Sequence, residues 1–394
     1  MRVKGNLQLM KEINTAMIMN LLHREGKITR AELTKITKLS PTTVSVLIEE
    51  LIARNLVEVI GEKISPGAGR RALALQINKD GGCVVGISLG IHSLICAVMN
   101  LHGQIVAEHR TKLEIGGVSL AQQIFDAITV CVNQVETLRA DLIMGIGISI
   151  PGIVDEQEET VVYSGLLKLR NVDLRKQLSV IFPSVPIKVV NDSNAAAFAE
   201  HYFGAGKDKS NLVYLRIDEG IGAGIILGSE IYSGYRGAAG EIGHISVDPD
   251  GEICNCGQRG CMETVLGGRY VLGRCRDLAT NLGIAVPDSL DEIIARSDAG
   301  ETWLEPVFER ISRVTSLMIA GTVNFLSPEV VIIEGWINRS VKLSEQLNAA
   351  LLNISVPFVF SKHGILRATF GEKGALFGSA ALMLHNIFSA SVLK

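Results

Sequence analysis

A histidine and three cysteines that lie close together restrict how the middle of this chain can fold. His244 is followed by Cys254, Cys256 and Cys261, the last three within the segment Cys-Asn-Cys-Gly-Gln-Arg-Gly-Cys. Thiolates and imidazole bind Zn²⁺ tetrahedrally, and the glycines allow the backbone to wrap around an ion. We therefore expect these four side chains to form a closed structural zinc site that leaves no position for a catalytic water. Free buried thiols are the alternative.

Length and composition favour a folded protein with more than one domain. The chain has 394 residues, 47% of them hydrophobic and 20% charged, and domains average about 150 residues. Seven cysteines, an odd number, suit a reducing compartment better than a disulfide framework. We expect Cys83, Cys96, Cys131 and Cys275 to be ordinary small apolar residues. The sequence shows no apolar leader and no apolar run of membrane-spanning length, so we expect a cytoplasmic protein without membrane insertion.

Charge is distributed unevenly along the chain. Residues 1–79 hold thirteen Lys and Arg against seven Asp and Glu, an excess of six positive charges. Because the whole chain has a net charge of -3, residues 80–394 carry a net charge of -9. Phosphate backbones attract the first part and repel the second, which indicates a nucleic-acid partner for the N-terminal part alone. A solvated basic face would have the same composition.

The basic N-terminal part has the pattern of a winged helix-turn-helix. Apolar spacing predicts helices at 11–24 and about 30–37, and Ser40 and Pro41 are the N-cap and first residue expected of a third. Strands predicted at 56–60 and 72–77, joined through residues 61–71, would form the wing. The expected core stripes are Ile13, Met17, Leu21 and Leu22 in the first helix, and Val44, Leu47, Ile48, Leu51 and Ile52 in the third.

The third helix would present short hydroxyl side chains to a DNA groove. Such side chains approach phosphates and base edges closely, and paired guanidinium groups on the flexible wing suit phosphates or a narrow minor groove. A three-helix packing module with a basic loop is the alternative. The candidate DNA contacts are Arg30, Ser40, Pro41, Thr42, Thr43, Ser45, Arg70 and Arg71.

The acidic remainder has mixed α/β order. Three consecutive strands followed by alternating helices and strands occur twice, which suggests two related lobes with a cleft between them. Strands are predicted at 83–88, 94–99, 105–113, 142–150, 187–190, 212–217, 224–227 and 330–333. Helices are predicted at 119–138, 193–203, 304–326 and 374–388.

Residues suited to binding a sugar surround the cysteine cluster in sequence. Asn191 and Asp192 follow a predicted strand, Glu241 precedes His244, and Glu263 follows Cys261. Carboxylates and amides recognise neighbouring hydroxyls through paired hydrogen bonds. If one ring nitrogen of His244 binds zinc, the other can face a ligand, so we expect all five residues to form a sugar site. Each residue alone is more often a solvated or capping group.

These motifs together resemble the ROK family of repressors, open reading frames and sugar kinases. The resemblance rests on residues 237–244 (Gly-Ala-Ala-Gly-Glu-Ile-Gly-His), the cysteine segment, and Ser149-Ile150-Pro151-Gly152. It extends through residues 191–196, 324–329 and 374–381, covers most of residues 80–390, and the basic head is similar to that of the repressor branch. It implies the sugar and zinc roles given above for these residues, and in kinases of the family Asp192 would be the general base.

The resemblance also implies an α/β fold and a division of the chain. A winged helix-turn-helix (residues 1–79) would precede two ribonuclease-H-like lobes of the actin and hexokinase type. The first lobe would comprise residues 80–195, to which the C-terminal helix 374–394 returns. The second, residues 196–373, would carry the structural zinc site and an oligomerisation surface.

The segments that bind ATP in kinases of the family are altered in this sequence. Ser88-Leu89-Gly90-Ile91-His92 lacks the carboxylate and hydroxyl of the first phosphate loop, and Asp218 and Glu219 precede the second loop, where they would repel a triphosphate. Trp336 stands where the kinases have glycine and is expected to obstruct the adenosine. We therefore expect no enzyme activity.

The sequence as a whole predicts a sugar-responsive transcriptional repressor of a carbohydrate-utilisation operon. Its expected partners are operator DNA, a monosaccharide or sugar-phosphate effector, and further copies of itself in a homodimer or dimer of dimers. Three alternatives stay open: an ATP-dependent sugar kinase with an appended head, a repressor sequestered by a sugar-transporter protein, and a structural DNA-binding protein.

Overall fold

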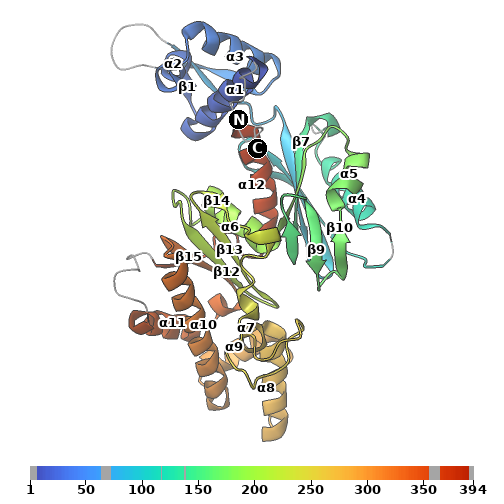
Figure 1. Cartoon of the computed structure of the whole chain (residues 1–394), viewed down its shortest axis with the longest axis vertical. Helices are drawn as coiled ribbons and strands as arrows, with labels where there is room; N and C mark the ends of the chain where they lie inside the picture. The colour runs from blue at the N-terminus through green and yellow to red at the C-terminus, as the bar shows by residue number, and fades with distance from the viewer. Residues whose placement is uncertain (1–6, 64–71, 117, 137–138, 355–363, 390–394) are drawn as a thin grey trace.

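A computed structural model describes residues 7–63, 72–116, 118–136, 139–354 and 364–389 (Figure 1). The chain forms a small head and a body built on two five-stranded sheets. Within the described residues, no helix is both long and apolar enough to span a membrane.

The head is a winged helix. It comprises α1 (Leu7–Glu25), β1 (Ile28–Thr29), α2 (Arg30–Thr37), α3 (Pro41–Ala53), β2 (Val57–Lys63) and β3 (Ala72–Ile77), and the strand order is β1-β3-β2. The predicted start of α3 is confirmed: the Ser40 hydroxyl accepts a hydrogen bond from the Thr43 amide at 3.1 Å, and Pro41 occupies the first turn.

The core of the head differs from the prediction in α1. Val44, Leu47, Ile48 and Leu51 of α3 are buried as expected, and Ile52 is half-buried. In α1, Leu22 is buried as predicted, but the other buried residues are Ile18 and Met19, while Met17 is 36% exposed and Ile13 and Leu21 are half-buried. The predicted stripe was therefore rotated, because the apolar residues of α1 fit more than one helical face and packing selected one of them.

The first sheet of the body has the strand order β11-β7-β4-β5-β6. Helices α4 and α5 pack on one face, and α12 packs on the other. At Gly147 of β7 an added Cβ would lie 1.9 Å from the Ser379 carbonyl oxygen, so this glycine permits the close approach of α12. The elements are β4 (Cys83–Leu89), β5 (Ser93–Asn100), β6 (Ile105–Lys112), α4 (Leu120–Val132), β7 (Ile143–Ile150), α5 (Leu174–Ile181), β11 (Ile187–Asn191) and α12 (Gly374–Phe388).

The second sheet repeats this arrangement. Its order, β14-β13-β12-β15-β16, again places an antiparallel meander beside two parallel strands. The elements are α6 (Asp192–Tyr202), β12 (Leu212–Ile217), β13 (Ile221–Leu227), β14 (Glu230–Ile231), α10 (Glu305–Leu326), β15 (Val330–Gly335), α11 (Val341–Ile354) and β16 (Ile365–Arg367). Helix α6 covers one face, and α10 packs in the core on the other.

Several elements were not predicted from the sequence. They are a small sheet of β8 (Ile153–Asp155), β9 (Thr160–Ser164) and β10 (Leu169–Val172), and the helices α5, α7 (Met262–Leu266), α8 (Gly268–Leu282), α9 (Leu290–Asp298) and α11. The helix predicted at 119–138 ends at Val132.

Helices α6 and α12 pack against each other between the sheets, and α12 also reaches the head (Figure 1). A single cluster of buried residues joins head and body. It contains Ile18, Leu22 and Leu75 of the head together with Val84, Met99, Leu384 and Phe388 of the body. The head is therefore packed against the body and is not merely tethered to it.

Candidate functional site

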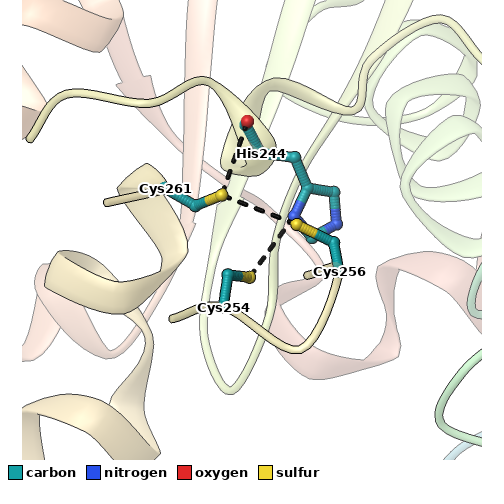
Figure 2. A group of neighbouring side chains, drawn as sticks. All are labelled: His244, Cys254, Cys256 and Cys261. Carbon is teal, nitrogen blue, oxygen red and sulfur yellow. Dashed lines mark hydrogen bonds between the residues drawn. The ribbon is translucent and has the colours of Figure 1, made fainter. Parts of the chain in front are cut away.

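The four predicted metal ligands converge, as Figure 2 shows. Their ligand atoms all lie within 4.8 Å of one another. Nδ1 of His244 is 3.7 Å from Sγ of Cys254, and Sγ of Cys256 is 3.6 Å from Sγ of Cys261. Ligands bonded at about 2.0–2.3 Å to one tetrahedral zinc ion are separated by about 3.5–3.8 Å. The donor set and its spacing therefore fit such an ion.

The loops around the cluster explain this convergence. His244 is the last residue of the short 3-10 helix Ile242–His244, and Cys261 immediately precedes α7. Gly260 has a φ of 65°, and a Cβ there would lie 1.6 Å from the Asp248 carbonyl oxygen, so a side chain would not fit. Burial raises the pKa of the Cys254 thiol, and it raises that of Cys261 to about 12. Without a metal these two thiols stay protonated at neutral pH.

His244 connects this cluster to the predicted sugar residues. Its Nδ1 faces Cys254, whereas its Nε2 lies 3.7 Å from Oε2 of Glu241. Glu263, on α7, accepts a hydrogen bond from Arg269 at 3.1 Å and one from the Ile221 amide at 3.4 Å. One ring nitrogen of His244 therefore faces a thiol and the other faces a carboxylate, and the predicted sugar role of these residues stays a prediction.

Asn191 has structural partners on both sides of its amide. Its side-chain oxygen caps α6 by accepting from the Asn194 amide at 3.0 Å, and its Nδ2 donates to the Gly152 carbonyl at 2.8 Å. These bonds join the Pro-Gly turn after β7 to the start of α6. The capping role therefore coexists with the predicted sugar role, which stays a prediction.

Asp192 and Glu241 lie in a poorly solvated, acidic environment. Burial raises the pKa of both carboxyl groups. Nearby Asp192 and Glu263 raise the pKa of Glu241 further, whereas His244 lowers it. Carboxylates in such surroundings favour ligands that donate hydrogen bonds, because each donor offsets part of the desolvation cost.

Arg216 is a residue of this site that the sequence analysis missed. Its Nη1 lies 2.8 Å from Oδ2 of Asp192, and the same guanidinium reaches Asp218 and Glu334 at 3.6 Å each. Burial alone would lower the pKa of Arg216, but the carboxylates of Asp192 and Glu334 raise it, so the group stays charged. A signal was present: Arg216 is the one charged residue in the apolar strand Leu-Val-Tyr-Leu-Arg-Ile.

The region expected to hold ATP in a kinase is a partly acidic pocket. Asp218, Glu334 and Glu372 line it, together with Arg339 and Arg367. The prediction that Trp336 obstructs this region is wrong. The Trp336 side chain does not line the pocket and is fully buried in the core of the second sheet, where its indole N–H donates to the Leu266 carbonyl at 3.0 Å. A large apolar side chain gains more free energy in that core than in a polar pocket.

Six of the eight DNA-contact candidates lie in the described part of the head. Arg30 begins α2 and pairs with Glu49 of α3. Pro41 and Thr42 are exposed, as is Ser40, whose hydroxyl caps α3, while Thr43 and Ser45 are half-buried. The N-terminal end of α3 therefore offers an accessible polar surface. Arg70 and Arg71 lie outside the described residues.

Comparisons with known proteins agree with this architecture. Residues 84–386 match the ROK family, and residues 12–71 match the MarR family. The xylose repressor of Caldicellulosiruptor bescii is 32% identical over 342 residues, which cover 84% of each chain. The N-acetylglucosamine repressor of Escherichia coli is 28% identical over 397 residues, which cover 99% of this chain and 97% of the repressor.

Solved structures give the same result. A ROK family transcriptional regulator, described as a homologue of the Escherichia coli MLC protein, superposes with a TM-score of 0.83 at 27% identity and covers 98% of both chains. The ROK hexokinase of Thermus thermophilus has a TM-score of 0.64 at 26% identity and covers 76% of this chain and 97% of the hexokinase. The predicted winged-helix head and sugar-kinase-like body are confirmed, and the chain belongs to the ROK family.

Proposed function

We propose that this protein is a sugar-responsive, DNA-binding transcriptional repressor of a carbohydrate-utilisation operon. The observation that carries the proposal is the hydrophobic core that the winged-helix head shares with the body. A head packed against the body in this way experiences any rearrangement of the body that a ligand favours. A ligand can change DNA binding only if it binds one such arrangement better than the other.

Operator DNA is the partner of the head. The N-terminal end of α3, with Thr42 exposed and Thr43 and Ser45 beside it, would enter the major groove, and the basic wing would contact phosphates. Operator half-sites repeat at about one helical turn, so two heads related by a two-fold axis are needed. We propose that the protein acts in the cytoplasm as a homodimer or a dimer of dimers.

The effector is a monosaccharide or a sugar phosphate bound at Asn191, Asp192, Glu241, His244 and Glu263. The geometry supports this assignment because His244 faces Glu241, and Glu241 is close enough to Asp192 and Glu263 for their charges to affect its pKa. The names of the two repressors above make xylose and N-acetylglucosamine the first sugars to test.

We propose a structural Zn²⁺ ion at His244, Cys254, Cys256 and Cys261. The ion would supply a fixed cross-link between the loop that carries His244 and the loop that leads to α7. The imidazole would then be held with Nε2 toward Glu241, so that the sugar residues keep one geometry.

A DNA-binding titration tests the function. Genomic fragments retained by the full-length protein supply a labelled duplex, and fluorescence anisotropy at fixed salt compares it with a scrambled duplex. We expect tight, sequence-dependent binding that one of xylose, glucose, N-acetylglucosamine or N-acetylglucosamine 6-phosphate weakens at least tenfold. Equal affinity for both duplexes would favour a structural DNA-binding protein, and sequence-specific binding that no sugar alters would favour sequestration by a transporter protein.

A kinase assay tests the enzymatic alternative. The ROK hexokinase resembles the body in fold, so the purified protein should be incubated with ATP, Mg²⁺ and the same sugars. We expect no turnover, because phosphoryl transfer requires bound ATP phosphates and their metal ion, and the carboxylates of Asp218 and Glu219 are expected to repel a triphosphate. Sustained sugar-dependent formation of ADP would overturn the repressor-only proposal.

A further inference from the structure

Arg216 joins carboxylates that come from different parts of the fold. It lies on β12 of the second sheet, whereas Asp192 begins α6 directly after β11, the last strand of the first sheet. Asp218 follows the end of β12, and Glu334 lies on β15. In the parallel pairing of β12 with β15, Arg216 and Glu334 are direct neighbours. The ion pair with Asp192 therefore links the end of the first sheet to the second sheet.

The three carboxylates need this guanidinium. The side chains of Asp192, Asp218 and Glu334 are only 16%, 29% and 7% exposed. Like charges that share a poorly solvated site repel one another, and removing the cation that pairs with all three carboxylates leaves more of that repulsion uncompensated. Burial raises the pKa of Glu334, and the charge of Arg216 opposes that rise.

The two oxygens of Asp192 have different partners. Oδ1 accepts a hydrogen bond from the Ser193 amide at 2.9 Å, and Oδ2 accepts one from Arg216 at 2.8 Å. The carboxylate plane is thereby fixed from two directions. A carboxylate oxygen can accept more than one hydrogen bond, so each keeps capacity for a donor from a ligand.

This inference rests on the sugar-sensing function proposed above. We propose that Arg216 is a positioning residue of the sugar site. It acts by holding the Asp192 carboxylate in place as an acceptor for a sugar hydroxyl. The guanidinium also favours the ionised form of Asp192, because a charge-assisted hydrogen bond stabilises the carboxylate. Arg216 thus keeps Asp192 in the form that accepts a hydrogen bond from a hydroxyl.

A double-mutant cycle tests the proposal. Isothermal titration calorimetry measures binding of xylose, glucose and N-acetylglucosamine to the full-length wild type, D192N, R216M and the double variant. We expect D192N and R216M each to weaken binding of the cognate sugar by roughly ten- to a hundredfold. We expect the double variant to bind about as weakly as D192N alone, because Arg216 acts through Asp192. A residue that merely stabilises the fold would give multiplicative effects.

Two further variants keep the result interpretable. R216M/E334Q neutralises the most buried of the three carboxylates that lose Arg216 and so eases folding, and R216K retains a cation and should recover part of the affinity. The matched control is R296M, since Arg296 pairs with Glu292 on α9 and has no contact with the carboxylates around Arg216. It should bind sugar as the wild type does.

The outcomes separate this inference from the proposed function. A wild type that binds none of these sugars would overturn the proposed sugar response and this inference with it. The role of Arg216 alone would be overturned if R216M bound the sugar with normal affinity while the wild type bound it and D192N did not. Independent, multiplicative effects of D192N and R216M would also overturn it.

Discussion

His244 faces two chemically different groups through its two ring nitrogens. Nδ1 is directed at the thiols of the cysteine cluster (Figure 2), and Nε2 lies 3.7 Å from Oε2 of Glu241. A metal bound to Nδ1 would leave Nε2 to carry the ring proton, which suits hydrogen bonding to a carboxylate. A change in the cluster is therefore expected to alter the orientation of a group in the proposed sugar site.

Replacing Cys256 by Ser tests the metal site. Removing one of four ligands from a structural site greatly lowers zinc affinity, so we expect C256S to lose most of its bound zinc and to respond less to sugar. Plasma mass spectrometry gives the metal stoichiometry, and anisotropy gives the sugar response. C275S is the control, because Cys275 is buried away from the cluster in α8. Full zinc content in C256S would contradict the assignment.

A charge placed on Thr42 tests the DNA surface. Thr42 is exposed in the first turn of α3, where a carboxylate stabilises a helix but repels phosphate. We expect T42E to keep the melting temperature of the wild type and to bind operator DNA at least tenfold more weakly. The control is T280E, which makes the same change of charge at Thr280, an exposed residue of α8 in the body. If both variants bound DNA like the wild type, Thr42 would lie outside the interface.

At the residue scale, the sequence was better at showing which residues form a site than at showing where their side chains point. The cysteine cluster could be predicted because its ligands are close in sequence, and their chemistry is specific. Arg216 was missed because its partners Asp192 and Glu334 are distant in sequence, and only the fold brings them together. The direction of the Trp336 side chain could not be predicted either. Trp336 directly follows β15, and the sequence does not show to which side of the sheet its side chain turns.

At the scale of elements, α6 and α12 form the connection between the two sheets. Each packs on a different sheet, and they pack on each other. The approach of α12 to β7 is close because Gly147 has no side chain. Helices α6, α10 and α12 were predicted with nearly the right bounds, whereas α8 and α11 were missed although they are about as long as α12. The short helices α7 and α9 and the sheet β8–β10 carry too few residues to show a period.

Two glycine-to-alanine substitutions, one at this close contact and one at an open position, should change stability with opposite signs. In G147A the new methyl group would meet the Ser379 backbone, so β7 and α12 must separate, and we expect a loss of about 2 kcal/mol or more in the free energy of unfolding. Gly273 lies within α8 with no atom within 4 Å of an added Cβ. G273A should therefore gain about 0.5–1 kcal/mol. Urea unfolding measures both, and equal stabilities would refute the close contact.

At the scale of the whole molecule, a stack of rings joins the head to the body. The imidazole of His23 on α1 stacks on Phe388 of α12, with centroids 4.6 Å apart, and on Tyr202 of α6 at 5.6 Å. Tyr202 is the last residue of the helix that begins at Asp192. The head therefore contacts both helices that lie between the sheets, and one of these helices begins at Asp192, a residue of the proposed sugar site. Sequence alone did not indicate this contact, because each ring comes from a different helix.

This ring stack makes the stability of the protein depend on pH. Burial lowers the pKa of His23 to about 4, and the charges of His102, Lys207 and His385 contribute to that shift. The unfolded chain has an ordinary histidine pKa near 6.5, so between pH 6.5 and about 4 it binds a proton that the folded protein does not. The contribution of His23 to stability is therefore complete above pH 6.5 and is lost as the pH falls toward 4.

Melting temperatures of H23L and the wild type at pH 7.5 and pH 5.0 measure this contribution. Leucine cannot be protonated and still fills apolar space, so we expect the melting temperature of H23L to fall less between the two pH values than that of the wild type. Part of the dependence should persist, because burial also lowers the pKa of His201 and His385. H92L removes an exposed histidine and should keep the wild-type dependence. Identical pH dependence in H23L and the wild type would show that His23 is not held neutral between head and body.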